Sequence, residues 1–231
     1  FFIFVYVMKN IVVFTGAGIS AESGLGTFRD SNGLWDNYKI EEVATPQAFK
    51  NNPALVLDFY NIRRRQLLKA SPNIAHKAIN KLKEKYNLNV ITQNIDDLHE
   101  RSGTRNVLHL HGKLTESKST FNNEIYEING SELNIGDTCQ NGKQLRPNVV
   151  WFGEDVPNME IAIEMVKNAD IFIVIGTSLN VYPAASLLNF TKNGARNIVI
   201  DPKLTNTDKY VELISEKATT GVPRIVDMLM S

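Results

Sequence analysis

The chain is poor in cysteine, with Cys139 alone among 231 residues. A single cysteine excludes a disulfide within the chain and suits a reducing compartment. It also speaks against a structural zinc, because one thiolate cannot complete a tetrahedral site. Neither sign of charge is in excess, since 25 Lys and Arg residues balance 25 Asp and Glu residues. This balance argues against nucleic acid and anionic membranes as partners, so a protein partner must be recognised locally.

Long hydrophobic runs are also lacking. The N-terminal stretch FFIFVYV, residues 1–7, is strongly apolar but too short to span a bilayer. It has neither the basic start nor the small-residue cleavage site of a signal peptide, so we expect a cytoplasmic protein. Because the stretch directly precedes Met8, we expect Met8 to be the natural start and the stretch to be an extension. The alternative is an edge strand or an exposed tail prone to aggregation.

Residues 11–30 are the most informative segment of the chain. The first four, IVVF, show no polar alternation, which is typical of a strand buried on both faces of a parallel sheet. Gly16, Gly18 and Ala21 follow in the spacing G-x-G-x-x-A. Small residues there let the backbone approach a pyrophosphate, and the local N–H groups favour an anion. An ordinary tight turn is the alternative, since this pattern alone is weak.

The continuation differs from that of a dehydrogenase, because no acidic strand end appears about twenty residues later. The segment GAGISAESGLGTFRD instead resembles the NAD-binding segment of the sirtuins, the NAD-dependent protein lysine deacylases. Motifs described below extend the resemblance over nearly the whole chain and indicate the bacterial, desuccinylase-like type. In this segment the resemblance implies eight residues that bind NAD: Gly16, Ala17, Gly18, Ser20, Glu22, Thr27, Phe28 and Arg29.

Residues 33–70 predict helices that leave the sheet and form a small lobe. Asn52 followed by Pro53 predicts a capped helix start with proline in the first turn. A second helix is predicted to continue to about Tyr86. We interpret His76 on that helix as a packed structural histidine.

Tyr60 and Arg63 are three residues apart on the first of these helices, so their side chains can share one face. The simplest interpretation is a tyrosine on the core and an arginine in water, as for the neighbouring Arg64 and Arg65. The resemblance favours a binding role, because desuccinylase-like sirtuins bind the carboxylate of succinyl-lysine with a Tyr-x-x-Arg pair. An upstream alanine accompanies that pair, and Ala44 stands at the matching place.

A strand is predicted at Leu88–Thr92, and polar residues crowd its carboxyl end, where ligands bind in open parallel sheets. The motif TQNID at this point resembles a sirtuin segment. The resemblance implies that Gln93 contacts the nicotinamide ribose and that Asp96 holds the nicotinamide amide. It gives Asn94 a catalytic role, the positioning of water and ribose hydroxyls, and it includes both Asn94 and Ile95 in the NAD-binding set.

His109 and His111 are two residues apart on a predicted strand and so share one face. Two such histidines could bind a metal, but no third ligand lies nearby in the sequence. The sirtuin general base immediately precedes a glycine, so the resemblance assigns that role to His111, which precedes Gly112. A neutral imidazole with a pKa of about 6.5 suits removal of a proton from a ribose hydroxyl near neutral pH. His109 is then a neighbour without chemistry.

Between Lys113 and Arg146 the sequence departs from the family. Most sirtuins hold this region with a structural zinc on two C-x-x-C pairs, whereas only Cys139 is present here. We therefore expect no zinc, and instead a small strand-and-turn cluster around a hairpin signal at Asn129–Gly130. The predicted cluster comprises Phe121, Ile125, Tyr126, Ile128, Leu133 and Ile135.

A strand is predicted at Val149–Phe152, ending at Gly153. By itself this stretch is typical of buried sheet, in which aromatic residues belong to the core. The motif VVWFGE resembles the sirtuin segment beside which the substrate peptide adds as a strand, a mode of binding that recognises lysine in many sequences. The resemblance implies that Val150 and Phe152 line the acyl-lysine channel, with Gly153 and Glu154 beside it.

Asp170–Ile175 is the most continuous apolar run and predicts a central parallel strand. Small and hydroxyl residues follow it, where a second phosphate or ribose contact is expected. The motif GTSLNVYPAA resembles the sirtuin G-T-S segment. The residues this implies are Gly176, Thr177 and Ser178 for NAD, Asp201 and Ala218 for the adenosine, and Asn180 and Val181 beside the peptide.

Together these segments predict an α/β fold, a doubly wound parallel sheet of Rossmann type with a small inserted helical lobe that lacks an intact zinc site. We expect the NAD-binding domain at residues 8–32, 73–112 and 148–231, and the small lobe at 33–72 and 113–147. The resemblance implies a deacetylase and desuccinylase that converts NAD and an acyl-lysine protein into nicotinamide, O-acyl-ADP-ribose and free lysine. Fold alone does not justify that step. Mono-ADP-ribosyl transfer, ordinary dehydrogenation and a non-catalytic NAD sensor are the alternatives.

Overall fold

The larger of the two sheets consists of six parallel strands. The computed structural model describes residues 8–26, 38–177, 184–204 and 210–231, so the stretch before Met8 lies outside the described residues. The strand order is β3-β2-β1-β7-β8-β9, which confirms the predicted α/β fold. The strands are β1 (Asn10–Thr15), β2 (Asn87–Thr92), β3 (Val107–His109), β7 (Ile171–Ile175), β8 (Arg196–Ile200) and β9 (Val211–Ile214).

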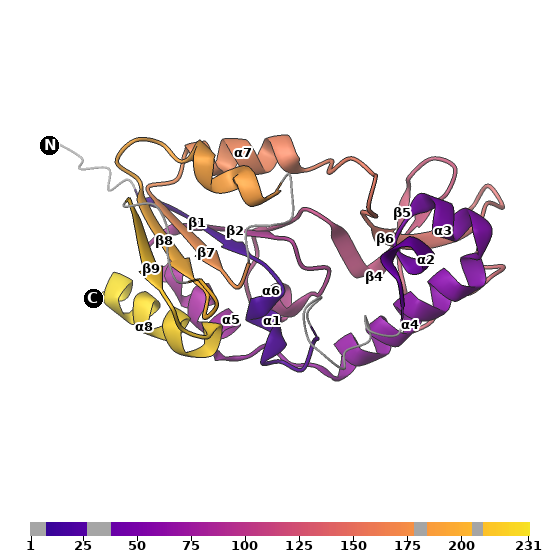
Figure 1. The fold of residues 1–231 in the computed structure, drawn as a ribbon, viewed down its shortest axis with the longest axis horizontal. Coiled ribbons are helices and arrows are strands. Elements are labelled where there is room, and N and C mark those ends of the chain that lie inside the picture. Colours follow the sequence, from indigo (N-terminus) through magenta and orange to yellow (C-terminus); the bar gives the residue numbers. More distant parts are fainter. Residues whose placement is uncertain (1–7, 27–37, 178–183, 205–209) are drawn as a thin grey trace, which may run out of the picture.

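Helices cover both faces of this sheet (Figure 1). Successive side chains of a strand point to opposite faces, so Val13 packs with α5 and α8 while Phe14 packs with α7 and η3. Both positions are fully buried, which explains why the first strand shows no polar alternation. The helices are α5 (Ile74–Lys81) and α8 (Ala218–Met230) on one face, and α7 (Met159–Lys167) and the 3₁₀ helix η3 (Ala184–Phe190) on the other.

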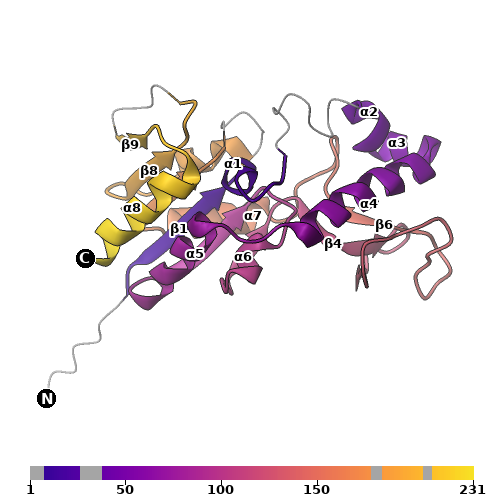
Figure 2. The same cartoon turned by 90° about the horizontal axis from the view of Figure 1, so that it is seen from below.

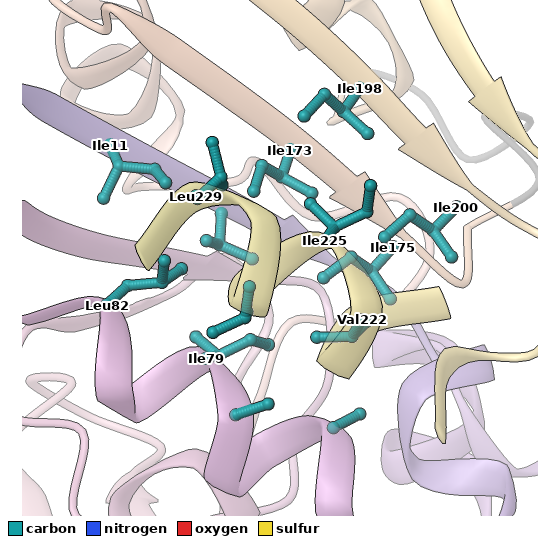
Figure 3. Close-up of a cluster of buried hydrophobic side chains, with 14 of the residues drawn as sticks. Ile11, Ile79, Leu82, Ile173, Ile175, Ile198, Ile200, Val222, Ile225 and Leu229 are labelled. Atoms are coloured by element: carbon teal, nitrogen blue, oxygen red, sulfur yellow. The ribbon is translucent and has the colours of Figure 1, made fainter. Parts of the chain in front are cut away.

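The cluster beneath α8 is the larger apolar core. Figure 3 shows Ile11 and Ile173 of the sheet close to Ile225 and Leu229 of α8. Removing this much apolar surface from water stabilises the sheet by roughly 25 cal/mol per Å² buried. The core therefore holds the strands rigidly, and the loops at their carboxyl ends start from fixed points.

A smaller antiparallel sheet, ordered β5-β4-β6, lies beside the large sheet along the long axis of the molecule (Figures 1 and 2). Three helices adjoin it, and α4 contacts both β4 and β6. The division of the chain into two lobes at the predicted boundaries stays a prediction. The elements here are β4 (Gly112–Ser119), β5 (Ile125–Glu127), β6 (Leu145–Val149), α2 (Ile40–Val43), α3 (Pro46–Asn51) and α4 (Pro53–Lys69).

The helix α4 begins as predicted, because the Asn52 side chain accepts a hydrogen bond from Leu55 N at 3.1 Å. The predicted hairpin at Asn129–Gly130 is wrong. The turn between β4 and β5 lies at residues 120–124, where Asn123 has a φ of 58° and Asn122 Oδ1 accepts from the N–H of residue 124. Asparagine tolerates the left-handed region and bonds its own backbone, so two asparagines make this turn without glycine.

Arg64 is fully buried, so the interpretation that placed it in water is wrong. Its Nε donates to Leu114 O at 2.7 Å. Its Nη1 donates to Asn61 Oδ1 at 2.8 Å and to Ser131 O at 2.9 Å. Asn61 in turn bonds both the N–H and the carbonyl of Leu133. Two polar side chains of α4 therefore tie the helix to β4 and to residues 131–133, in the region where most sirtuins would hold zinc.

The region around Cys139 gives a test for zinc. Among the described residues, no three histidine, cysteine, aspartate or glutamate side chains are grouped so that they could hold a metal ion. We predict that the purified protein contains no stoichiometric zinc and that a chelator leaves its melting temperature unchanged, since a structural zinc contributes folding free energy that a chelator removes. Elemental analysis and thermal melts measure both. One equivalent of tightly held zinc contradicts the prediction.

The remaining described helices are short. They are α1 (Gly18–Ala21), the 3₁₀ helix η2 (Leu82–Glu84) and α6 (Leu98–Arg101). In the described part of the chain, no helix has the length and apolar character needed to cross a membrane. The cytoplasmic location stays a prediction.

Candidate active site

The strand order reverses between β1 and β7. From β1 the chain continues through β2 to β3 on one side, and from β7 through β8 to β9 on the other. Open parallel sheets bind ligands outside the carboxyl ends of the strands at such a switch point. The loops after β1 and β7 meet here, because Gly18 N donates to Gly176 O at 2.9 Å and Gly16 N donates to Ile175 O at 3.0 Å. The predicted nucleotide segment thus lies where this class of fold binds ligands.

The glycines of the β1 loop are required by its contact with the β7 loop. A Cβ on Gly18 would stand 2.6 Å from Gly176 Cα, and a Cβ on Gly16 would stand 2.8 Å from Gly176 O. No side chain fits at these distances. This reason differs from the predicted one, a close approach to pyrophosphate, because the N–H of Gly18 already donates to Gly176 O. The spacing G-x-G therefore packs two ligand-side loops against each other.

A buried polar network joins the β1 loop to the segment after β2. Asn94 Nδ2 donates to Gly16 O at 3.1 Å and to Ser20 Oγ at 3.2 Å, and Ser20 Oγ donates to Asp96 Oδ2 at 2.9 Å. Burial raises the pKa of the Asp96 carboxyl, and hydrogen bonds from Ser20 and from Leu98 N oppose that rise. The network brings four of the predicted NAD-binding residues, Gly16, Ser20, Asn94 and Asp96, into direct contact.

Gln93 links the segment after β2 to the loop after β7. Its Oε1 accepts a hydrogen bond from Thr177 Oγ1 at 3.1 Å. Its Nε2 is buried and has no hydrogen-bond partner among the described residues. A buried amide donor without a partner is costly, and a ribose hydroxyl would satisfy it. The residues present therefore fit the sugar of NAD, in the role predicted for Gln93.

His111 lies directly beside Gln93. Its Nδ1 is 3.0 Å from Gln93 O, and because a carbonyl only accepts, Nδ1 carries the hydrogen and Nε2 keeps its lone pair. Burial lowers the pKa of His111, and the bond to the Gln93 carbonyl opposes this. The imidazole is therefore neutral near pH 7, the form that a general base needs. The next residue, Gly112, has a φ of 78°, and a Cβ there would stand 2.0 Å from Asn148 O.

The predicted strand at Val149–Phe152 is only partly correct, because β6 ends at Val149. The chain turns instead: Glu154 N donates to Trp151 O at 3.0 Å, and Gly153 between them has a φ of 91°. The residues before the turn are held by other segments. Val150 N donates to His111 O at 2.9 Å, and Phe152 N donates to Ala44 O at 3.0 Å. Direct backbone bonds thus join this segment to His111 and to Ala44, which is itself a predicted substrate residue.

Glu154 holds this turn together. Its carboxylate makes a two-pronged pair with Arg146, at 2.6 and 3.0 Å, and also accepts from Trp151 N at 2.8 Å. Burial favours the neutral acid, but these hydrogen bonds outweigh it and lower the pKa of Glu154. The carboxylate is thus committed to the turn. Val150 and Glu154 also line a hollow of about 350 Å³, together with Lys118, Asn123, Ile125, Asn148, Asp155 and Pro157.

Tyr60 lies next to this turn, and Arg63 lies beside Tyr60. Tyr60 is buried, with 1% of its surface exposed, and its hydroxyl oxygen accepts from Trp151 Nε1 at 3.0 Å. The Arg63 guanidinium lies 5.9 Å from the Tyr60 ring centre and is only partly exposed. Burial lowers the pKa of Arg63, and the attraction of Tyr60 and Asp96 opposes this. The interpretation of Arg63 as a solvated arginine is therefore wrong, and Arg63 lies close enough to the TQNID segment for the charge of Asp96 to act on it.

Comparison with known proteins decides the family. The Sir2 family model matches residues 16–183. The chain belongs to the Sir2 family. A relative from Bacteroides thetaiotaomicron, named NAD-dependent protein deacylase, is 49% identical over 231 residues, or 96% of this chain and 99% of the relative.

Solved Sir2 structures share the fold as well. A mutant Sir2 homologue in complex with ADP ribose matches with a TM-score of 0.89 at 41% identity, covering 96% of this chain and 92% of that chain. A Sir2 homologue in complex with NAD matches with a TM-score of 0.86 at 40% identity, covering 96% and 90%. The predicted family, the enzyme class of NAD-dependent protein deacylase and NAD as the co-substrate are thereby confirmed.

In this Sir2 protein His109 is held differently from His111. It is buried, with Nδ1 3.0 Å from Asn94 O and Nε2 2.8 Å from Glu100 Oε1. Both of its nitrogens are therefore occupied, whereas only Nδ1 of His111 has a described partner. This agrees with the assignment of the base to His111 and leaves neither nitrogen of His109 for a metal.

A second pair of histidines lies buried behind the site. The rings of His76 and His99 meet edge to face with centres 5.0 Å apart, and His99 Nε2 lies 3.0 Å from Thr15 Oγ1 at the end of β1. Burial lowers the pKa of His76 to about 4, and burial together with the charge of His76 lowers the pKa of His99 to about 3. Both rings are packed as neutral groups, the role predicted for His76.

We predict that acid destabilises the protein through this pair. The folded pKa values lie below the unfolded value of about 6.5, so unfolding takes up protons once the pH falls below about 6.5. The stability contribution is complete above that pH and declines by up to about 1.4 kcal/mol per pH unit for each histidine as the pH falls toward 4. Urea unfolding across this range measures the slope. His76→Leu should remove about half of it, and an unchanged slope contradicts the prediction.

Three more predicted NAD-binding residues, Glu22, Asp201 and Ala218, lie in the described part of the chain. Glu22 Oε2 accepts from Thr219 Oγ1 at 2.6 Å, which brings Glu22 beside the first turn of α8 and Ala218. Asp201 is buried and closes the turn after β8 by accepting from Lys203 N at 2.8 Å. Six predicted site residues lie outside the described residues: Thr27, Phe28, Arg29, Ser178, Asn180 and Val181.

Sequence reasoning missed two residues that organise the site. The sequence marked Arg146 only as the end of a divergent region and Trp151 only as a core aromatic, yet the two stack with the Arg146 guanidinium 3.3 Å from the Trp151 ring centre. The spacing Arg-x₇-Glu offered a signal, because two side chains of opposite charge at this spacing can pair when the chain between them turns back. The bond from Trp151 to Tyr60 had no signal, since 91 residues separate them.

Proposed function

We propose that this protein removes acyl groups, succinyl in particular, from lysine side chains of other proteins. The observation that carries the proposal is the direct contact between a neutral His111 and the Val150–Glu154 turn that holds Tyr60. One hydrogen bond joins His111 O to Val150 N, and another joins Trp151 to Tyr60. The proposed base, His111, is thus connected through Val150 and Trp151 to Tyr60, the proposed receptor for the acyl chain.

NAD supplies the ribose that accepts the acyl group and the nicotinamide that leaves. Gln93, Asn94 and Asp96 would hold its nicotinamide and ribose, as the unpaired Gln93 Nε2 supports. His111 then takes a proton from a ribose hydroxyl through its free Nε2. Because Nδ1 is fixed on the Gln93 carbonyl, the ring orientation is set by the same residue that contacts the sugar.

Tyr60 and Arg63 would bind the carboxylate at the far end of a succinyl chain. Arg63 offers a planar fork of donors and Tyr60 one hydroxyl, and the small Ala44, bonded to Phe152, leaves room for a longer chain. Both groups are at least partly desolvated, which strengthens a charged hydrogen bond. A carboxylate entering here would meet a cation whose own charge is disfavoured by burial.

The test compares a succinyl-lysine peptide with an acetyl-lysine peptide in two variants, Arg63→Met and Arg65→Met. A charged hydrogen bond contributes about 1.5–3 kcal/mol, so Arg63→Met should lower kcat/KM for a succinyl-lysine peptide about tenfold to a hundredfold. The acetyl-lysine peptide has no carboxylate to lose and should change far less. The matched control is Arg65→Met, because Arg65 lies on the same helix with an exposed partner, Glu132. Equal losses on both substrates, or no succinyl activity in the parent, would overturn the proposal.

A further inference from the structure

The bond between Trp151 and Tyr60 decides what the Tyr60 hydroxyl can do. Trp151 Nε1 can only donate, and it lies 3.0 Å from the hydroxyl oxygen, with both side chains buried. A tyrosine hydroxyl has one proton to donate and two lone pairs. The indole occupies one lone pair and blocks the direction from which it comes. The hydroxyl proton must point elsewhere, and no acceptor among the described residues lies within hydrogen-bond distance of it.

We propose that Trp151 is a positioning residue for acyl-chain specificity, which turns the Tyr60 hydroxyl into a dedicated donor for an acyl group that ends in a carboxylate. This inference rests on the proposed function. A carboxylate only accepts, so it satisfies the hydroxyl that the indole has oriented. A neutral chain of the same length leaves a buried O–H unpaired, and a site built in this way discriminates against it.

The indole is held in place for this task. One of its faces stacks on the Arg146 guanidinium, 3.3 Å from the ring centre, and its ring also contacts Phe49, with centres 5.3 Å apart. The two-pronged Arg146–Glu154 pair fixes that guanidinium, and Glu154 also accepts from Trp151 N. Both the ring and the backbone of Trp151 are therefore anchored by the same carboxylate.

The neighbours of Trp151 connect this anchor to the rest of the site. Val150 N is bonded to His111 O, and Phe152 N to Ala44 O. Trp151 thus lies between Val150, which is bonded to the proposed base His111, and Phe152, which is bonded to Ala44. A shift of Trp151 would move the receptor relative to the base, while a loss of its N–H alone would free only the Tyr60 hydroxyl.

The experiment compares a succinyl-lysine with a butyryl-lysine peptide, because the chains match in length and differ in the terminal carboxylate. Trp151→Phe removes the N–H and should lower the succinyl-to-butyryl ratio of kcat/KM about threefold to tenfold, chiefly through a higher KM for the succinyl peptide. Phe49→Leu is the matched control. It loosens the packing of the same indole but keeps the N–H, so it should lower kcat/KM for the two peptides by similar factors and leave their ratio unchanged.

A double-mutant cycle with Tyr60→Phe separates positioning from general packing. If Trp151 acts through the Tyr60 hydroxyl, Trp151→Phe has no further effect on the ratio once that hydroxyl is gone. An equal fall in both backgrounds, or an unchanged ratio in either single variant, overturns the inference. Tyr60→Phe alone keeps it testable should Trp151→Phe fail to fold. A parent enzyme without succinyl activity overturns the proposed function itself, whereas succinyl activity that is insensitive to Trp151 overturns only this inference.

Discussion

His111→Ala should lower kcat/KM for an acyl-lysine peptide about a hundredfold to ten-thousandfold while NAD still binds, since general-base catalysis contributes that much. In the proposed mechanism the neutral imidazole is the general base, with Nδ1 fixed by the Gln93 carbonyl and Nε2 free to take a proton. NAD contacts other side chains in this account, so its affinity, measured by calorimetry, should change little. Steady-state kinetics measure the rate.

His109→Gln is the comparison for this variant. Both nitrogens of His109 are occupied, by Asn94 O and by Glu100, so its loss should cost stability more than chemistry. The pH profile adds a second check. Because burial lowers the pKa of His111, the acid limb of kcat/KM should lie below about pH 6.5. An equal loss in the two variants, or a limb above that pH, contradicts the assignment.

Arg64→Met should lower the free energy of unfolding by about 3–5 kcal/mol, the usual cost of removing one partner from a buried charged network. Three acceptors lose their donor: Leu114 O, Asn61 Oδ1 and Ser131 O. Burial lowers the pKa of Arg64 to about 10, so it stays charged at neutral pH and holds all three. For a chain of this size the loss corresponds to a fall of about 6–20 °C in melting temperature.

Arg65→Met is the matched control for this effect. Arg65 is the next residue of α4, and its 2.7 Å bond to Glu132 joins two side chains that are each 44% exposed. Exposed pairs of this kind contribute about 0–1 kcal/mol. A thermal melt of the two variants therefore separates them, and equal melting temperatures would contradict a structural role for Arg64.

The ligand-side loops of the large sheet could be predicted from the sequence. Buried strands such as β1 and β7 show unbroken apolar runs, and parallel strands bring their carboxyl ends to one edge. Polar residues that follow such strands, for example Gln93 and Thr177, are then expected at that edge, where these two lie 3.1 Å apart. These predictions needed only the direction of the strands and no knowledge of packing angles.

The three consecutive arginines of α4 show what the sequence could not predict, namely which of them is buried. Arg63, Arg64 and Arg65 have the same chemistry, and their positions differ only by rotation about the helix axis. A signal was present, because Leu57, Asn61, Arg64 and Leu67 follow one another at spacings of three and four and are all buried. An asparagine and an arginine within that stripe indicate a buried polar contact, yet only the tertiary structure supplies their backbone partners, Leu133 for Asn61 and Leu114 for Arg64.

The most direct test of the account is to incubate the purified protein with NAD and an acyl-lysine peptide and to follow all products by mass spectrometry. The account predicts free lysine peptide, nicotinamide and O-acyl-ADP-ribose in equal amounts, with nicotinamide release only when the lysine is acylated. A peptide that keeps its acyl group and gains ADP-ribose would instead indicate a mono-ADP-ribosyltransferase. NADH would indicate a dehydrogenase, and tight NAD binding without any product would indicate a sensor; each of these results contradicts the account.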